Sequence, residues 1–229
     1  MESHKVLLFD IDATLLKTGW AGFRALDRIF DELYGVPKAT DGILPAGKTD
    51  PLIMREMVEK RLPHLDPDRE IPRVVELYVK YLAEEVEISP GFRVMPGVPE
   101  LLEALSGIPH LALGLATGNL EQGAYIKLQR AWLRSYFSFG GCGSDSENRT
   151  ELVLAAISRA KDHLQDDVPL DSIYVIGDTP RDILHGKEAG TRTVAVATGG
   201  SDVEELAKHD PDFLFEDFTA TDSVVEIFL

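Results

Sequence analysis

The feature that most constrains the fold is a repeated alternation of short apolar runs with helix-length stretches. The runs are rich in β-branched or aromatic residues and end at Gly, Asp or Thr, as buried parallel strands do. They cover residues 6–9, 111–117, 174–177, 193–198 and 213–215. Stretches with helical spacing or helix end signals lie between the later runs, at residues 98–106, 121–134, 149–164 and 180–189. This alternation predicts an α/β protein with a doubly wound, mostly parallel, Rossmann-like sheet.

Residues 17–93 interrupt the alternation, because they contain no convincing strand. They indicate helices near 20–34, 50–61 and 69–87, and the segment is too long for a simple connection. We interpret it as a small all-helical cap domain inserted after the first strand. Residues 1–16 and 94–229 then form the catalytic core. The two crossings, near 16–19 and 90–95, are expected to act as hinges.

The charge balance and the lone cysteine limit the partners and the compartment. The net charge of −16 argues against binding to nucleic acid or to anionic lipid, both of which need a basic surface. The apolar run near the N-terminus is too short for a signal peptide or a membrane span. Cys142 is the single cysteine, and we expect a small, half-buried residue in a cytoplasmic protein. The sequence leaves the oligomeric state open.

Polar residues stand where three of the expected strands end. Asp10 and Asp12 follow the first, Thr117-Gly118-Asn119 follows the second, and Asp178 and Asp182 follow a later one. In a doubly wound sheet these ends lie together. Carboxylates without His or Cys favour Mg²⁺ over Zn²⁺. A hydroxyl and free backbone amides at a helix start suit a phosphate oxygen.

The spacing of Asp10 and Asp12 suggests two chemical roles in one site. Residues two apart on a strand point to the same side. One carboxylate can attack phosphorus as a nucleophile, and the other can protonate the leaving alcohol and later accept a proton from water.

These residues resemble three motifs of the haloacid dehalogenase-like superfamily, in its phosphatase branch. Asp-x-Asp-x-Thr stands here as Asp10, Asp12 and Thr14, the second motif as Thr117, and Gly-Asp-x-x-x-Asp as Gly177, Asp178 and Asp182. The inserted helices are similar to the family's helical cap, and the chain looks most similar to phosphoglycolate-phosphatase-like members.

The resemblance implies a role for each of these residues. Asp10 would be the nucleophile that forms an aspartyl-phosphate, and Asp12 the acid/base whose backbone carbonyl also binds Mg²⁺. Asp178 would be a metal ligand, and Asp182 would bind the metal or its waters. Thr117, with Gly118 and Asn119, would hold the phosphoryl group.

Two positions depart from the family pattern. The usual glycine after the second aspartate is Ala13, which would be strained if the backbone there needs a positive φ. The usual third-motif lysine is absent from SDSENRTELV. We assign that cation to Arg149, which can pair with carboxylate and phosphate, and we rank Lys161 second because it lies far into the helix.

Together these features predict a Mg²⁺-dependent phosphatase for a small phosphorylated metabolite. Lys48, in the cap segment AGKTD, is the candidate for contact with an anionic substrate. A phosphomutase of the β-phosphoglucomutase type and a silent phosphate-binding regulator remain alternatives. A dehalogenase is disfavoured because displacing a halide needs no acid at Asp12, and the family's phosphonatases lack that second aspartate.

Overall fold

The computed structural model describes residues 3–229 and contains a six-stranded sheet whose neighbouring strands all run parallel. The order across the sheet is β5-β4-β1-β6-β7-β8. The strands are β1 Lys5–Phe9, β4 Leu111–Thr117, β5 Phe139–Cys142, β6 Ile173–Gly177, β7 Arg192–Val196 and β8 Phe213–Phe215. The expected doubly wound α/β fold is confirmed, and its order places the ends of β1, β4 and β6 side by side.

Helices cover both faces of the sheet because successive residues of each strand point to opposite sides. Leu7 and Phe9 of β1 pack into an apolar cluster with helices α4, α5 and α9. Val6 and Leu8 pack on the other side, against helix α6. These four helices are α4 Val98–Ser106, α5 Glu121–Arg130, α6 Arg149–Leu164 and α9 Thr221–Glu226.

The remaining core elements are short or lie toward the β8 edge of the sheet. Helix α7 spans Pro180–Glu188, and Ile183 within it packs against Ala195 of β7. Helix α8 spans Val203–Ala207, and two 3₁₀ turns span Arg134–Tyr136 and Leu170–Ser172. Within residues 3–229, no helix combines the length and the apolar character that crossing a bilayer requires.

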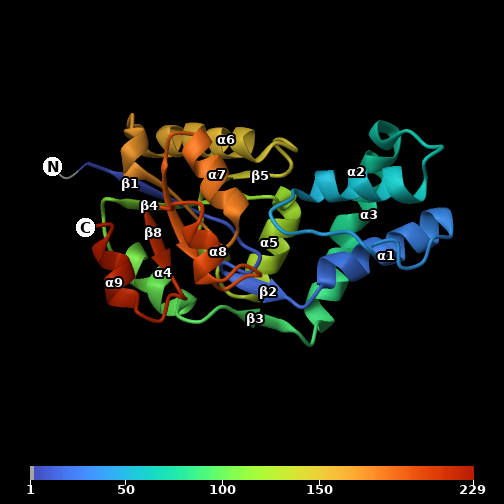
Figure 1. The fold of residues 1–229 in the computed structure, drawn as a ribbon, viewed down its shortest axis with the longest axis horizontal. Helices are drawn as coiled ribbons and strands as arrows, with labels where there is room; N and C mark the ends of the chain where they lie inside the picture. The colour runs from blue at the N-terminus through green and yellow to red at the C-terminus, as the bar shows by residue number, and fades with distance from the viewer. Residues whose placement is uncertain (1–2) are drawn as a thin grey trace.

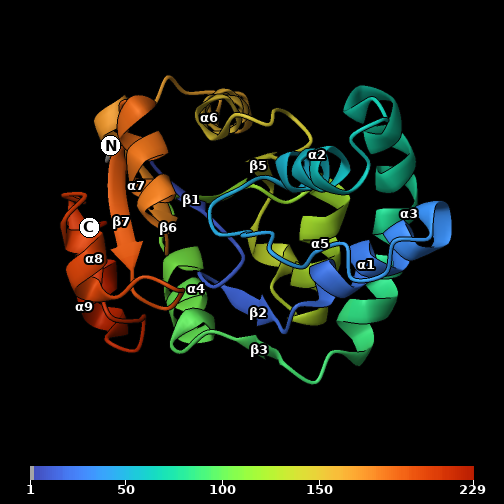
Figure 2. The same ribbon diagram turned by 45° about the vertical axis from the view of Figure 1, so that its right-hand side comes forward.

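Three helices form a separate body at the end of the molecule opposite both termini (Figures 1 and 2). They are α1 Ala21–Tyr34, α2 Asp50–Arg61 and α3 Pro67–Ile88. Their apolar side chains gather in a cluster of their own around Phe30, Met57 and Tyr78. We call residues 17–93 the cap, and their treatment as a separate domain stays an interpretation.

The expectation that the cap segment holds no strand was wrong at its two borders. Strand β2, Leu16–Thr18, pairs antiparallel with β3, Phe92–Val94. Each strand has three residues, too few to show an alternating pattern, and each is stabilised by the other. The two strands lie at the expected crossings, where the chain leaves the core and returns to it (Figure 2).

Two glycines are needed at the crossing because the two segments of the chain that join the cap to the core nearly touch there. A Cβ atom on Gly19 would lie 2.6 Å from the Cα of Gly91, and a Cβ on Gly91 would lie 2.9 Å from the Cα of Gly19. Arg24 lies here too and donates hydrogen bonds to Glu85, at 2.8 Å, and to Ser89, at 3.0 Å. Arg24 therefore ties the start of α1 to the end of α3.

Ala13, which stands where the family pattern has glycine, does have a positive φ. Its φ is 66°, a region that costs a residue with a side chain about 1–2 kcal/mol. Ala13→Gly should therefore raise the free energy of unfolding by about 0.5–1 kcal/mol, after the greater chain entropy of glycine is subtracted. Urea denaturation would measure it, with Ala104→Gly on the exposed side of α4 as a control that should lose stability. A less stable Ala13→Gly would show that this turn carries no strain.

Candidate active site

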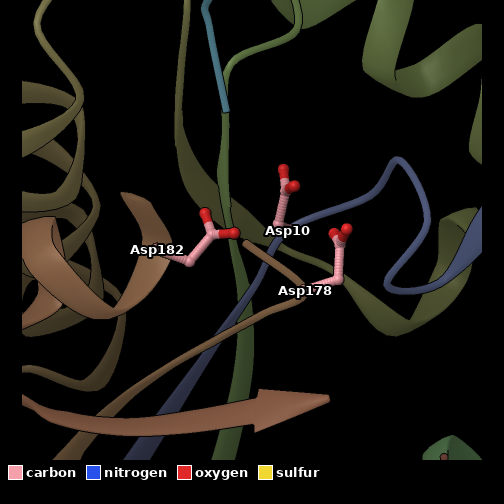
Figure 3. Close-up of side chains that lie close together, drawn as sticks. All are labelled: Asp10, Asp178 and Asp182. Atoms are coloured by element: carbon pink, nitrogen blue, oxygen red, sulfur yellow. The ribbon is translucent and has the colours of Figure 1, made fainter. Parts of the chain in front are cut away.

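Three aspartates from neighbouring elements converge at the carboxyl end of the sheet. Asp10 follows β1, Asp178 follows β6, and Asp182 lies in the first turn of α7. One oxygen of each lies within 4.8 Å of the others, and Figure 3 shows the three carboxylates facing a common space. All three side chains are buried. The strand order thus brings together residues that are separated by up to 172 positions in the sequence.

Burial and the repulsion of neighbouring charges make the carboxylates of Asp10 and Asp178 unusually basic. Burial raises the pKa of Asp10 to about 7, with further increases from Asp182 and Asp12 and a decrease from Arg149. The pKa of Asp178 is also raised well above its usual range, by burial and by the charges of Asp182 and Asp10. Thr14 offsets part of this by donating to Asp178 at 3.0 Å. A cluster of this kind favours a bound cation.

Arg149 supplies a positive charge to the cluster from the first turn of α6. Its guanidinium donates to Oδ1 of Asp182 and lies 3.8 Å from Oδ1 of Asp10. Burial by itself would lower the pKa of Arg149, but Asp182, Asp10 and Asp178 together raise it. Lys161 lies twelve residues further along the helix, about 18 Å away at 1.5 Å per residue, and pairs with Asp167 instead.

Asp182 combines a structural bond with its place in the cluster. Its Oδ2 accepts from the backbone N–H of Thr179 at 3.0 Å and from the Thr179 hydroxyl at 2.6 Å, and the two residues form a capping box on α7. Its Oδ1 accepts from Arg149. Both oxygens of Asp182 therefore have protein partners, which favours contact with a metal through water over direct ligation.

Asp12 lies beside the three aspartates, with its side chain held by another set of residues. Oδ2 of Asp12 accepts from Asn119 at 2.8 Å and from Lys127 at 2.6 Å. Asn119 also donates 2.7 Å to the hydroxyl oxygen of Thr117, which is fully buried at the end of β4. The side chain of Asp12 is thus separate from the cluster of Asp10, Asp178 and Asp182. Any metal contact from this residue falls to its backbone carbonyl.

Gly118 is one of the points where the cap meets the core. A Cβ atom at Gly118 would lie 2.5 Å from the carbonyl oxygen of Lys48 and 3.0 Å from the Cα of Thr49. Only glycine lets the cap loop approach this closely. The side chain of Lys48 pairs with Glu56 of α2, which also binds Lys60 at 2.7 Å. The structure therefore places the backbone of Lys48 at the site while its ammonium group pairs within the cap.

The residues present suit Mg²⁺. Every group in the cluster is a carboxylate, a hard oxygen donor of the kind that Mg²⁺ prefers. Asp178 has room for its carboxylate because Gly199 has no side chain; a Cβ there would lie 1.7 Å from Oδ2 of Asp178. Asp10 and Asp178 would ligate the ion directly, with Asp182 behind them.

Comparison with known proteins identifies the family of this chain. The profile of the family described as haloacid dehalogenase-like hydrolase matches residues 7–196. The chain belongs to this family. The match confirms the resemblance carried by the three motifs, and it makes the chain a member of a hydrolase family.

Individual relatives in this family are distant in sequence but extend over almost the whole chain. The chain is 29% identical to a probable phosphatase, IndB, of Dickeya dadantii, over 93% of this chain and 90% of that protein. It is 25% identical to the pyrophosphatase PpaX of Bacillus pumilus, over 92% and 91%. A crystal structure of a predicted phosphoglycolate phosphatase from Haemophilus somnus superposes with a TM-score of 0.73, at 19% identity and 98% and 99% coverage. At that identity, the superposition shows the shared fold alone.

Sequence reasoning missed Lys127 and Asp50, which lie beside the site. Lys127 is one of four buried residues on α5, with Gly123, Ala124 and Leu128. That spacing puts the lysine on the buried face of the helix, so the helical periodicity of the sequence could have predicted that Lys127 is buried. Asp50 opens α2, where an acidic residue ordinarily stabilises the helix dipole, so no sequence signal pointed to its hydrogen bonds with the core.

Proposed function

We propose that the protein is a cytoplasmic, Mg²⁺-dependent phosphatase that hydrolyses a small phosphorylated metabolite through an aspartyl-phosphate. One observation carries the proposal: Asp10 lies beside a cation, Arg149, and two further buried carboxylates, with Asp12 held nearby. A nucleophile, an acid/base and groups for a phosphate are therefore within one site. The phosphatase names among the relatives support the same class of reaction.

The first half of the reaction transfers the phosphoryl group to Asp10. An oxygen of Asp10 attacks phosphorus, and the bond from phosphorus to the ester oxygen breaks. The electron pair stays on the leaving oxygen, which takes a proton from Asp12. Thr117 and the backbone amides after β4 hold the phosphoryl oxygens, and Arg149 offsets their charge.

The second half releases phosphate, regenerates the ionised carboxylate of Asp10 and returns Asp12 to its protonated form. Asp12 takes a proton from a water molecule whose oxygen attacks phosphorus, and the bond between phosphorus and Asp10 breaks. A bound Mg²⁺ would supply positive charge that lets the phosphate dianion approach the aspartates and stabilises charge in the transition state. Inorganic phosphate and ionised Asp10 are the products.

The cap would select the leaving group by covering the site. Closure excludes water and lets cap residues contact the part of the substrate beyond phosphorus. Lys48 is the cap residue that we propose for an anionic group of the substrate, in exchange for its contact with Glu56. A short acidic ester of the phosphoglycolate type fits this arrangement.

The test is a phosphate-release screen over a panel of metabolite esters, with and without Mg²⁺. We expect release from one class of small ester, and none in excess chelator. Sugar phosphates that isomerise without releasing phosphate would instead identify a phosphomutase. Binding of phosphate esters with no turnover of any kind would identify a regulator.

Mg²⁺ should also stabilise the fold, most strongly at neutral pH and above. A ligand at 100 times its Kd adds about 2.7 kcal/mol, which for a chain of this size raises Tm by about 5–10 °C. Because the pKa of Asp10 without metal is raised to about 7, protons compete with the metal below that pH. Thermal melts at pH 5 and pH 8, with and without Mg²⁺, would show a larger shift at pH 8. An equal shift at both pH values would contradict the assignment of these carboxylates as ligands.

A further inference from the structure

Lys127 is a buried cation that the proposed reaction does not use. Its side chain is 5% exposed, although lysine is almost never buried without a partner. It lies on α5, in the core, and its ammonium group reaches Asp12 and the side-chain oxygen of Asn119. Because Lys127 donates to Asp12 and to the asparagine that also holds Asp12, its role is to be sought in what it does to Asp12.

Lys127 and Asn119 hold one carboxylate oxygen of Asp12, Oδ2, and leave the other, Oδ1, without a hydrogen-bond donor. Both donors reach Oδ2, at 2.6 Å and 2.8 Å. Among residues 3–229, no side chain or backbone group is seen donating to Oδ1 of Asp12, and this side chain is 46% exposed. The carboxylate is therefore held against rotation with Oδ1 on its open side.

The cap completes this arrangement through Asp50, which bonds to the residues on both sides of Asn119. The backbone N–H of Asp50 donates 2.7 Å to the carbonyl oxygen of Gly118. Oδ2 of Asp50 accepts from the backbone N–H of Leu120 at 3.0 Å. One cap residue thus brackets the loop whose asparagine holds Asp12.

A second contact keeps the same end of the cap on the core. Thr49 donates 3.3 Å to the carbonyl oxygen of Glu147, and Arg55 binds the Glu147 carboxylate through two nitrogens at 2.9 Å and 2.8 Å. Glu147 precedes α6, the helix that begins with Arg149. The start of α2 is therefore docked on two loops of the site.

We propose that Lys127 is a positioning residue for Asp12, that it assigns proton exchange with the substrate to Oδ1, and that Asp50 completes this alignment when the cap is closed. The inference rests on the proposed phosphatase reaction. In that reaction Oδ1 gives its proton to the leaving oxygen as the ester bond breaks, and later accepts one from the attacking water. With the cap open, Asp50 no longer brackets Asn119, so the acid is aligned only around an enclosed substrate.

The test compares kcat/KM for an alkyl and an aryl phosphate ester in Lys127→Met. This constant reports the steps up to release of the alcohol, in which an alkyl leaving group needs the acid and a phenolate needs it far less. We expect a loss of about 10²-fold for the alkyl ester, the scale of a misplaced catalytic group, and less than about fivefold for the aryl ester. Lys161→Met, at a half-exposed lysine of α6 that pairs with Asp167, is the matched control and should leave both constants unchanged.

A second variant keeps the test valid if the single change impairs folding. Lys127→Met combined with Asp50→Asn removes both the cation and the cap carboxylate and keeps an acceptor for the N–H of Leu120. It should show the same difference between esters. Equal losses for both esters, or wild-type constants for the alkyl ester, would overturn the proposal while phosphatase activity in the wild type stands.

A crystal structure of the Lys127→Met variant tests the positioning role directly and needs no activity measurement. We expect the carboxylate of Asp12 to rotate or to occupy more than one position. An unchanged carboxylate would overturn the positioning role. If the wild type releases no phosphate from any ester, the proposed function fails, and this structure still tests whether Lys127 orients Asp12.

Discussion

Asp10→Asn should abolish phosphate release, by at least about 10⁴-fold in kcat, and leave the fold intact. An amide cannot replace the attacking oxygen, and loss of a covalent nucleophile is among the most damaging single changes in an enzyme. The substitution is nearly isosteric, and it removes one of three crowded carboxylates. Kinetics on the best ester from the screen and a thermal melt would measure both effects.

The stability of this variant has a definite sign. Because the folded-state pKa of Asp10 is raised to about 7, the folded protein holds a proton there that the unfolded chain releases. Ionised Asp10 therefore lowers the stability of the metal-free protein as the pH rises from about 4 to 7. Asp10→Asn should be at least as stable as the wild type at pH 8 without metal. A well-folded variant with substantial activity would rule out Asp10 as the nucleophile.

Arg149→Met should reduce both turnover and stability. Removing the guanidinium leaves Asp10, Asp178 and Asp182 without their buried positive partner, and breaking a buried ion pair costs about 3–5 kcal/mol. Loss of a charge that stabilises the transition state costs about 10²–10³-fold in kcat. Denaturant unfolding and steady-state kinetics measure the two effects separately.

Two comparison variants make the result for Arg149 specific. Arg149→Lys keeps a cation in the place where the family usually has a lysine, and should keep more activity than Arg149→Met. Arg159→Met, on the exposed side of the same helix, removes a surface pair with Asp145 and should leave kcat unchanged. Wild-type turnover in Arg149→Met would contradict its place as the third-motif cation.

The sequence was informative wherever a pattern is local. The run before Asp10 and those before Thr117 and Asp178 identified parallel strands, and their alternation with helices set the order that gathers the three ends. The span of α6 was expected at 149–164 and is found there. One arginine at a helix start has many uses, so the sequence alone does not distinguish Arg149 from a surface residue. Arg149 lies within 3.8 Å of Asp10.

The sequence was silent where contacts join distant segments. The bonds of Lys127 and Asn119 to Asp12 cross more than a hundred positions, and Asp50 reaches Leu120 from another part of the fold. No periodicity encodes such pairs, since each depends on how α5 and the cap pack. The helix expected over 121–134 ends earlier, at Arg130, and Trp132 takes a positive φ of 60°, which is incompatible with a continuing helix.

The most direct test of the proposed reaction is to trap the phosphate on Asp10. Asp12→Asn should still transfer phosphate from an aryl ester to Asp10, but should lack the base that activates water, so the adduct should accumulate. Rapid acid quench and mass spectrometry of the peptide that carries residue 10 would detect it. We predict a phosphate adduct on Asp10 that disappears when Asp10→Asn is added. Release of the phenol and of phosphate with no adduct on Asp10 at any time would contradict the aspartyl-phosphate mechanism.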